Sequence, residues 1–216
     1  VIRPSSEDAA RATIAAVRAA EDVGLVTGVA APADFLDDGD ALDELAQAGL
    51  DHLALMLAGP DAASHDAVLR AGEHGKLVRL CERAARRQVP LTGEIPLVDA
   101  NWARVGEILR AASPLGMLGV TAWALAGDAK GAIPRDALRQ VAVTLEHAAD
   151  GVSLPVTWAA PVRAVDVRRD VLRGPRTDGD FGVRIAADGS VLPPRASGEP
   201  AGNLDAAEHW DEIARS

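Results

Sequence analysis

The sequence has a single cysteine, Cys81, and no tyrosine among its 216 residues. One cysteine excludes an internal disulfide and any metal site built only from cysteines of this chain. Cys81 lies in a helical pattern, where a small, half-buried side chain is the expected role. No apolar run approaches the roughly 18 residues of a membrane span, and we recognise no signal peptide. These absences predict a cytoplasmic protein.

Aromatic residues make up only 3% of the sequence, whereas hydrophobic residues as a whole make up 48%. The core must therefore consist mainly of Ala, Leu and Val, a composition that suits helices packed on a parallel sheet. The net charge of −10 and the pI near 4.9 disfavour nucleic acid and anionic membranes as partners.

Strand-like apolar runs alternate with amphipathic segments of helical period. The runs that predict strands are 25–31, 50–59, 90–98, 116–127 and 153–160. The segments that predict helices are 6–24, 37–48, 61–88 with an interruption near Ala71 and Gly72, 101–113 and 133–151. Such alternation indicates right-handed βαβ units and a parallel sheet. Five strands fall short of a complete barrel, so the predicted fold class is α/β, a partial TIM-like (β/α) barrel.

The composition of the sequence changes after Pro161, where charged residues, Gly and Pro become frequent. We therefore divide the chain into a partial barrel over residues 1–162, a charged linker over 163–180 and a small appendage over 181–216. Within 181–195, two short strand patterns flank Asp188-Gly189, which predicts a β-hairpin. A short closing helix is expected from about Asp205.

Several motifs in the barrel segment occur in an order and spacing that resemble the middle of a radical-SAM domain. They are a turn, a strand-end corner, a His-Asp pair near the start of a long helix, a Gly, and an Asn that opens a later helix. In this sequence they are Ala48-Gly49-Leu50-Asp51, Met56-Leu57-Ala58-Gly59, His65-Asp66, Gly72 and Asn101. The appendage is similar to the SPASM-type extension of the same family. The matching residues there are Asp188-Gly189-Ser190-Val191-Leu192-Pro193-Pro194, Gly202-Asn203-Leu204 and Trp210.

The sequence also departs from that family where its chemistry resides. Radical-SAM enzymes need three thiolates in a CxxxCxxC loop to hold a [4Fe–4S] cluster that binds S-adenosylmethionine. We therefore expect no cofactor, unless an upstream segment supplies the cysteines for the cluster and S-adenosylmethionine. Polar strand ends are also replaced, at Val29-Ala30-Ala31 and Met56-Leu57-Ala58-Gly59, and Pro194 stands where the tail would carry a cysteine. These losses favour a degenerate domain over a truncated enzyme.

Three functions stay open. The first is a non-catalytic binding or scaffold role for a peptide or small molecule, with a partner chain or self-association at the open edge of the partial barrel. The second is a fragment of a radical-SAM/SPASM peptide- or metabolite-modifying enzyme whose cluster-binding N-terminal part is missing. The third is a cofactor-independent barrel lyase or isomerase that uses Glu94 as its base.

The predicted ligand site lies near the carboxyl ends of the strands, where barrels of this kind bind their ligands. Its residues are Glu94, Asp99, Asn101, Trp123 and Trp158. Glu94 would be a buried carboxylate in need of a partner if it points into the barrel. Trp123 and Trp158 would form an apolar wall, while helix capping by Asp99 or Asn101 is the simpler alternative. We assign no catalytic residue and no metal ligand, because the five histidines lack metal-binding spacings.

Overall fold

The computed structural model describes residues 2, 10–37, 40–126, 130–158, 172–173, 184–185, 190–192 and 202–203. The chain divides into two compact units, Val1–Pro175 and Arg176–Ser216. The first unit contains a parallel sheet with helices, and the second contains three short antiparallel strands.

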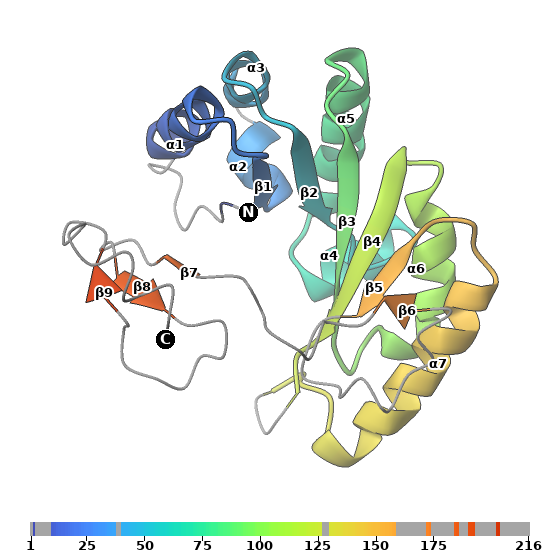
Figure 1. Cartoon of the computed structure of the whole chain (residues 1–216). Helices are drawn as coiled ribbons and strands as arrows, with labels where there is room; N and C mark the ends of the chain where they lie inside the picture. Colours follow the sequence, from blue (N-terminus) through green and yellow to red (C-terminus); the bar gives the residue numbers. More distant parts are fainter. Residues whose placement is uncertain are drawn as a thin grey trace. The chain divides into compact units, whose positions relative to one another are not determined.

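The sheet of the first unit has its strands in the same order as the sequence, and every neighbouring pair is parallel (Figure 1). The strands are β1 (Gly28–Ala31), β2 (His52–Met56), β3 (Leu91–Leu97), β4 (Met117–Ala124), β5 (Val156–Trp158) and β6 (Leu172–Arg173). Sequential order distinguishes a singly wound (β/α) barrel from a doubly wound sheet, in which the order reverses. The predicted fold class, a partial (β/α) barrel, is confirmed.

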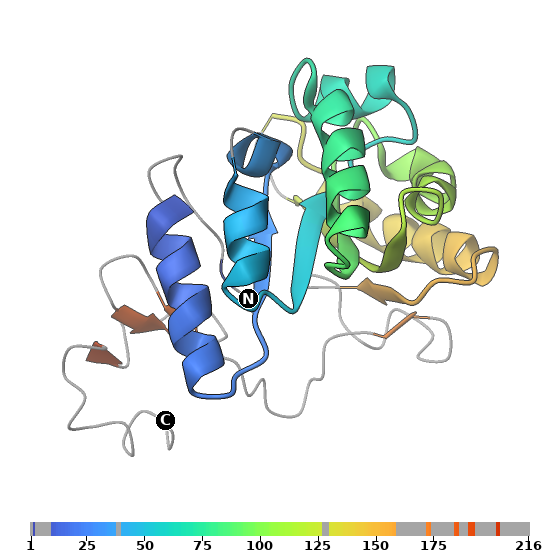
Figure 2. The same cartoon turned by 90° about the horizontal axis from the view of Figure 1, so that it is seen from above.

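The helices follow one another in an arc along one side of this sheet (Figure 2). They are α1 (Ala10–Asp22), α2 (Ala33–Asp37), α3 (Ala41–Gln47), α4 (Ala62–Val68), α5 (Glu73–Arg86), α6 (Val105–Ala112) and α7 (Leu138–Asp150), with short 3-10 turns η2 (Trp102–Arg104) and η3 (Arg135–Ala137). Right-handed crossovers between successive parallel strands place all connecting helices on the same face. No described helix is both long enough and apolar enough to cross a membrane.

The core fills the space between the sheet and the helices. Alternate strand residues such as Leu53, Leu55 and Ile95 point into it and are fully buried. Leu77 and Leu80 of α5 meet them from the helix layer and are also fully buried. Because side chains alternate along a strand, the residues between these leucines and isoleucines occupy the opposite face of the sheet.

Most predicted elements match the structure, with two corrections. The five predicted strands correspond to β1–β5, and the predicted interruption is confirmed at Gly72, whose φ of 86° separates α4 from α5. The predicted helix over 37–48 corresponds to α3 but begins too early, and it misses the separate short helix α2 before it. The linker prediction is wrong at Leu172–Arg173, which pairs with β5 as a sixth strand.

The β1 edge of the sheet, which we expected to be open, carries one further paired residue. Ile2 lies parallel to β1 in an isolated bridge with Val29. Its N–H donates to the Gly28 carbonyl at 2.7 Å, and its carbonyl accepts from the Ala30 N–H at 2.9 Å. The sheet therefore extends by one position beyond β1.

The second unit contains the predicted hairpin. β7 (Arg184–Ile185) pairs antiparallel with β8 (Ser190–Leu192), and β9 (Gly202–Asn203) pairs with β8 on its other side. The predicted closing helix from Asp205, together with Pro194 and Trp210, lies outside the described residues.

Trp158 provides a test of the core. Its side chain is fully buried, and within the described structure its indole Nε1 has no hydrogen-bond partner. Trp158→Ala should lower the free energy of unfolding by about 3–5 kcal/mol because it leaves a large cavity. Trp158→Phe should cost about 1 kcal/mol or less, since it keeps most of the ring and removes an unpaired buried donor. Urea unfolding measures both, and equal losses in the two variants would contradict this account.

Candidate functional site

The face of the sheet opposite the helices contains a hollow of about 260 Å³. It spans the amino-terminal and central parts of four strands, from β2 to β5. The lining residues are His52, Ala54, Thr92, Gly93, Glu94, Gly119, Val120, Thr121, Pro155 and Thr157. Small residues at positions 54 and 119 leave space above the backbone, and polar side chains surround this space.

The polar residues of the hollow are arranged by strand register. Glu94 of β3 lies opposite Met56 of β2 on one side and Thr121 of β4 on the other. Thr121 in turn lies opposite Thr157 of β5. Adjacent strands are about 4.8 Å apart, so these four residues form one row across the sheet. We call the residues Met56, Glu94, Thr121 and Thr157 the central row.

Glu94 is the acidic residue among the described lining residues and is only 7% exposed. It engages in an interaction within the chain. The threonines on both sides of the hollow, Thr92 and Thr157, are half-buried, as is Thr121. A hydroxyl both donates and accepts, so this lining can bind either kind of polar group on a ligand.

His52 forms the amino-terminal end of the hollow. Its imidazole lies over Gly28 of β1, where even the Cβ of an alanine would collide with the ring. Gly28 therefore leaves room for the imidazole at this position, and a larger residue there would make the ring move.

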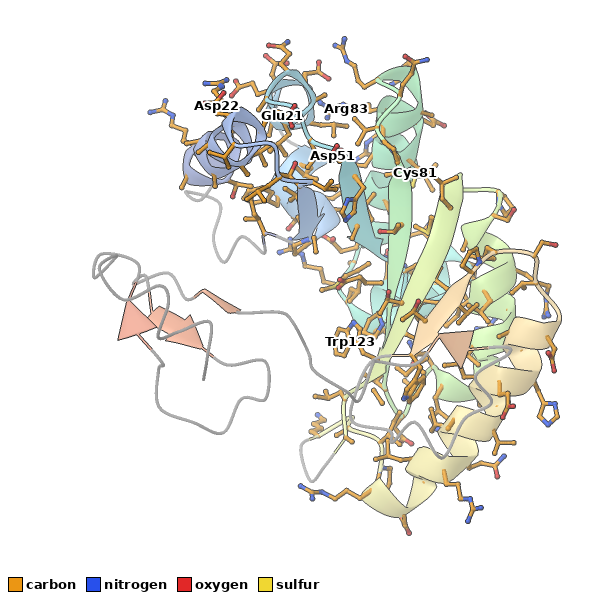
Figure 3. All side chains as sticks on the ribbon, viewed as in Figure 1. Glu21, Asp22, Asp51, Cys81, Arg83 and Trp123 are labelled. Atoms are coloured by element: carbon orange, nitrogen blue, oxygen red, sulfur yellow. The ribbon has the colours of Figure 1, made fainter. Side chains whose placement is uncertain are left out.

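The five predicted site residues do not gather in one place. Glu94 lies in the hollow, and Trp123, labelled at the lower end of β4 in Figure 3, lies on the same face one row beyond the central row. Trp158 stands opposite Ala122 and lies on the helix side in the core, so the two tryptophans do not form the expected wall. Asp99 is exposed in the loop after β3, where its N–H donates to the Gly131 carbonyl.

Asn101, the fifth predicted residue, holds together the ends of two strands. It is 4% exposed, and its Nδ2 donates to the carbonyls of Ala58 and Pro96, both at 2.9 Å. Its Oδ1 accepts from the Val98 N–H at 2.8 Å. The side chain is thus committed to the backbone on the carboxyl side of β2 and β3, and no side-chain hydrogen bond caps the helix that follows.

The side chains of His65 and Asp66 also form hydrogen bonds with backbone groups. The Nδ1 of His65 accepts from the Ala58 N–H at 3.2 Å, and the Asp66 carboxylate accepts from the N–H groups of Gly72 and His74. Burial lowers the pKa of His65 to about 4, and the neighbouring His74 ring adds to this effect while Asp66 opposes it. The two backbone N–H groups lower the pKa of Asp66.

Sequence reasoning missed the three threonines and His52. Their signal is the alternation of polar and apolar residues within a strand, as in Val156-Thr157-Trp158. That signal shows two faces but does not tell which face adjoins the helices.

The residues present do not suit an iron–sulfur cluster. Cys81, the single cysteine of the sequence, lies on α5 and is 4% exposed (Figure 3). Burial raises the pKa of its thiol to about 11, which disfavours the thiolate that a metal needs. No group of three or more His, Cys, Asp or Glu that could hold a metal occurs among the residues that the structure describes.

Comparison with known proteins gives structural matches only. No protein-family model matches the chain, and no curated protein sequence matches it. Hydroxymethylglutaryl-CoA lyase from Pseudomonas aeruginosa aligns at 18% identity and a TM-score of 0.43, over 62% of this chain and 44% of that one. A radical SAM methyltransferase from Sphaerobacter thermophilus aligns at 20% identity and a TM-score of 0.43, over 61% and 39%. HMG-CoA lyase from Brucella melitensis aligns at 13% identity and a TM-score of 0.49, over 72% and 56%.

The chain therefore spans between 39% and 56% of the length of these proteins. At such identities their activities do not transfer to this chain.

Asn101→Ala tests the tie between the strand ends. The substitution leaves two buried carbonyls and one N–H without their partner, so the free energy of unfolding should fall by about 3 kcal/mol. Gln47→Ala, which removes an exposed amide on α3, is the control and should change it by less than about 0.5 kcal/mol. Chemical denaturation measures the free energy of unfolding of both variants. Similar small losses in the two would show that the hydrogen bonds of Asn101 do not stabilise the strand ends.

The buried imidazole of His65 predicts a pH dependence of stability. Its pKa is about 4 in the folded chain against 6.5 for an ordinary histidine, so the unfolded chain binds more protons between these values. The free energy of unfolding should therefore fall as the pH drops from 6.5 towards 4, by at most about 1.4 kcal/mol per pH unit. His65→Asn retains an acceptor for the Ala58 N–H and should flatten this slope. An unchanged slope in that variant would assign the effect to other groups.

Proposed function

We propose that this chain is a degenerate radical-SAM-like partial barrel that binds a small polar molecule on the open face of its sheet and does not carry out radical chemistry itself. The resemblance of its motifs to the middle of a radical-SAM domain supports the family part of the proposal. The parallel, sequentially ordered sheet is compatible with it.

The observation that carries the binding role is the central row next to its hollow. A carboxylate and two hydroxyls, from Glu94, Thr121 and Thr157, line a space of about 260 Å³ on a face that no described helix covers. Ligand sites in proteins combine a mostly preformed concavity with a few polar groups that fix orientation. These groups lie on strands rather than loops, so their positions are well defined.

Binding fits the hollow better than acid–base catalysis by His52 and Glu94, the two titratable residues among its described lining. Leu53 pairs with Leu91, so His52 stands level with Pro90, four residues before Glu94 along β3. At about 3.3 Å per residue the two are roughly 13 Å apart along the strands. A catalytic pair needs hydrogen-bond reach, about 3 Å between heavy atoms, to the same reacting group. His52 and Glu94 therefore act as separate binding groups.

A fragment screen by NMR tests the binding role. Small polar fragments should shift the amide signals of Thr92, Glu94, Thr121 and Thr157 together. Thr157→Val should weaken the fragments that bind by roughly three- to tenfold, the loss of one hydrogen bond.

The matched control is Thr144→Val. Thr144 lies on α7, away from the hollow, and its hydroxyl donates to the Gln140 carbonyl of its own helix. It should leave fragment affinity unchanged. The proposal fails if no fragment shifts the four signals, or if the two valine variants weaken binding equally.

A further inference from the structure

We infer that the open face of the sheet binds a small amphiphilic polyol, such as a glycoside, with its hydroxyl groups in the hollow and its apolar substituent on Trp123 and Leu125. This inference rests on the proposed binding function and names the class of ligand for it.

Three threonine hydroxyls on adjacent strands form the polar end of this site. Thr121 and Thr157 lie opposite each other on β4 and β5. Thr92 lies on β3, two residues before Glu94, and so one position nearer the amino-terminal end of the sheet than the central row. All three threonines are half-buried and line the hollow. Because a hydroxyl both donates and accepts, a ligand with several hydroxyls can pair with more than one of these threonines at once.

Next to this polar end, the same face of the sheet becomes apolar along β4. Side chains alternate along a strand, so Thr121, Trp123 and Leu125 point to the same side. Leu125 directly follows β4, and its N–H donates to the Leu97 carbonyl at 2.9 Å, which continues the pairing with β3. Pro96 of β3 lies opposite Trp123 and extends the apolar part sideways. The open face therefore passes from hydroxyl to indole to aliphatic side chain.

The two large apolar side chains of this strand end are accessible. Leu125 is 44% exposed and Trp123 is half-buried, and neither belongs to the described hydrophobic core. Ala122 and Ala124, which point to the other side of β4, are buried in that core. An accessible indole and leucine beside a polar hollow suit a ligand with one polar and one apolar end.

The dimensions of the site set the size of the ligand. Pockets that take drug-sized ligands measure about 300–1,000 Å³, so a hollow of 260 Å³ admits about one ring. Trp123 lies two residues from Thr121, about 6.6 Å along the strand. One six-membered ring spans this spacing between its hydroxyls and its substituent. A glycoside with a short alkyl group meets both requirements.

Three compounds test the two ends of the ligand. They are methyl β-D-glucopyranoside, butyl β-D-glucopyranoside and butan-1-ol, and NMR titration of the full chain measures their dissociation constants. A fully buried methylene strengthens binding about fourfold, and contact with one face of the sheet buries the butyl group in part. The butyl glucoside should therefore bind about five- to tenfold more tightly than the methyl glucoside. Butan-1-ol, which lacks the ring hydroxyls, should bind at least about tenfold more weakly than the butyl glucoside.

Variants locate the apolar and the polar end separately. Trp123→Ala should bring the butyl glucoside to within about twofold of the methyl glucoside and leave the methyl glucoside unchanged. Thr157→Val should weaken both glucosides by the same factor, about three- to tenfold. Leu25→Ala is the matched control, because Leu25 is 60% exposed in the turn before β1, and it should change neither affinity.

Two further measurements keep the test decisive if Trp123→Ala fails to fold. Leu125→Ser alters an exposed side chain and should reduce the preference for the butyl glucoside by about two- to threefold. On the unaltered chain, the amide signals of Trp123 and Leu125 should shift more with the butyl than with the methyl glucoside, whereas those of Thr121 and Thr157 should shift with both.

The outcomes separate the ligand class from the proposed function. If the two glucosides bind equally and both depend on Thr157, the hollow is a binding site but the apolar end is wrong. If butan-1-ol binds as tightly as the butyl glucoside, the hydroxyl end is wrong. If no glucoside binds at millimolar concentration, the ligand class is wrong, and the fragment screen decides the binding role separately.

Discussion

Parallel strands that pair in sequence order are joined by crossovers of one hand, and such crossovers place every helix on the same side of the sheet. This constraint divides the residues of each strand into two sets. Leu53 and Leu55 belong to the set that the helices bury, while His52 and Ala54 belong to the set that they leave uncovered. In a complete barrel the second set fills the interior. Here the second set lines the hollow, so polar side chains can form a row across the sheet without lying in the hydrophobic core.

The carboxyl ends of the strands, where barrels commonly bind ligands, are used for a different purpose in this chain. Asn101 and His65 satisfy backbone groups around Ala58, and Asp66 satisfies those at the start of α5. A side chain that already bonds to buried backbone is not available to a ligand without a cost in stability. Among the described residues, other polar side chains lie lower on the strands, in the central row and next to His52.

The sequence was sufficient for the strands, since each is a short apolar run between helical segments, and for the break at Gly72. It was not sufficient for β6, because Leu172–Arg173 is a two-residue strand within a charged segment and is defined by pairing with β5 alone. The sequence was also not sufficient to predict which side chains face the site. Whether Trp158 faces a ligand or the core depends on register, and a shift of one residue reverses every side chain. Only the pairing of Ala122 with Trp158 resolves that choice.

Glu94 and Asn101 are both buried and polar, yet the fold depends on them differently. Asn101 completes three backbone hydrogen bonds, so stability alone explains an amide at that position. Glu94 instead lies beside Met56 in the middle of a strand, where an apolar side chain of similar volume would avoid the cost of dehydrating a carboxylate. Glu94 also has an interaction within the chain. Glu94 differs from Asn101 in that it lines the hollow, so its carboxylate both interacts within the chain and borders that space.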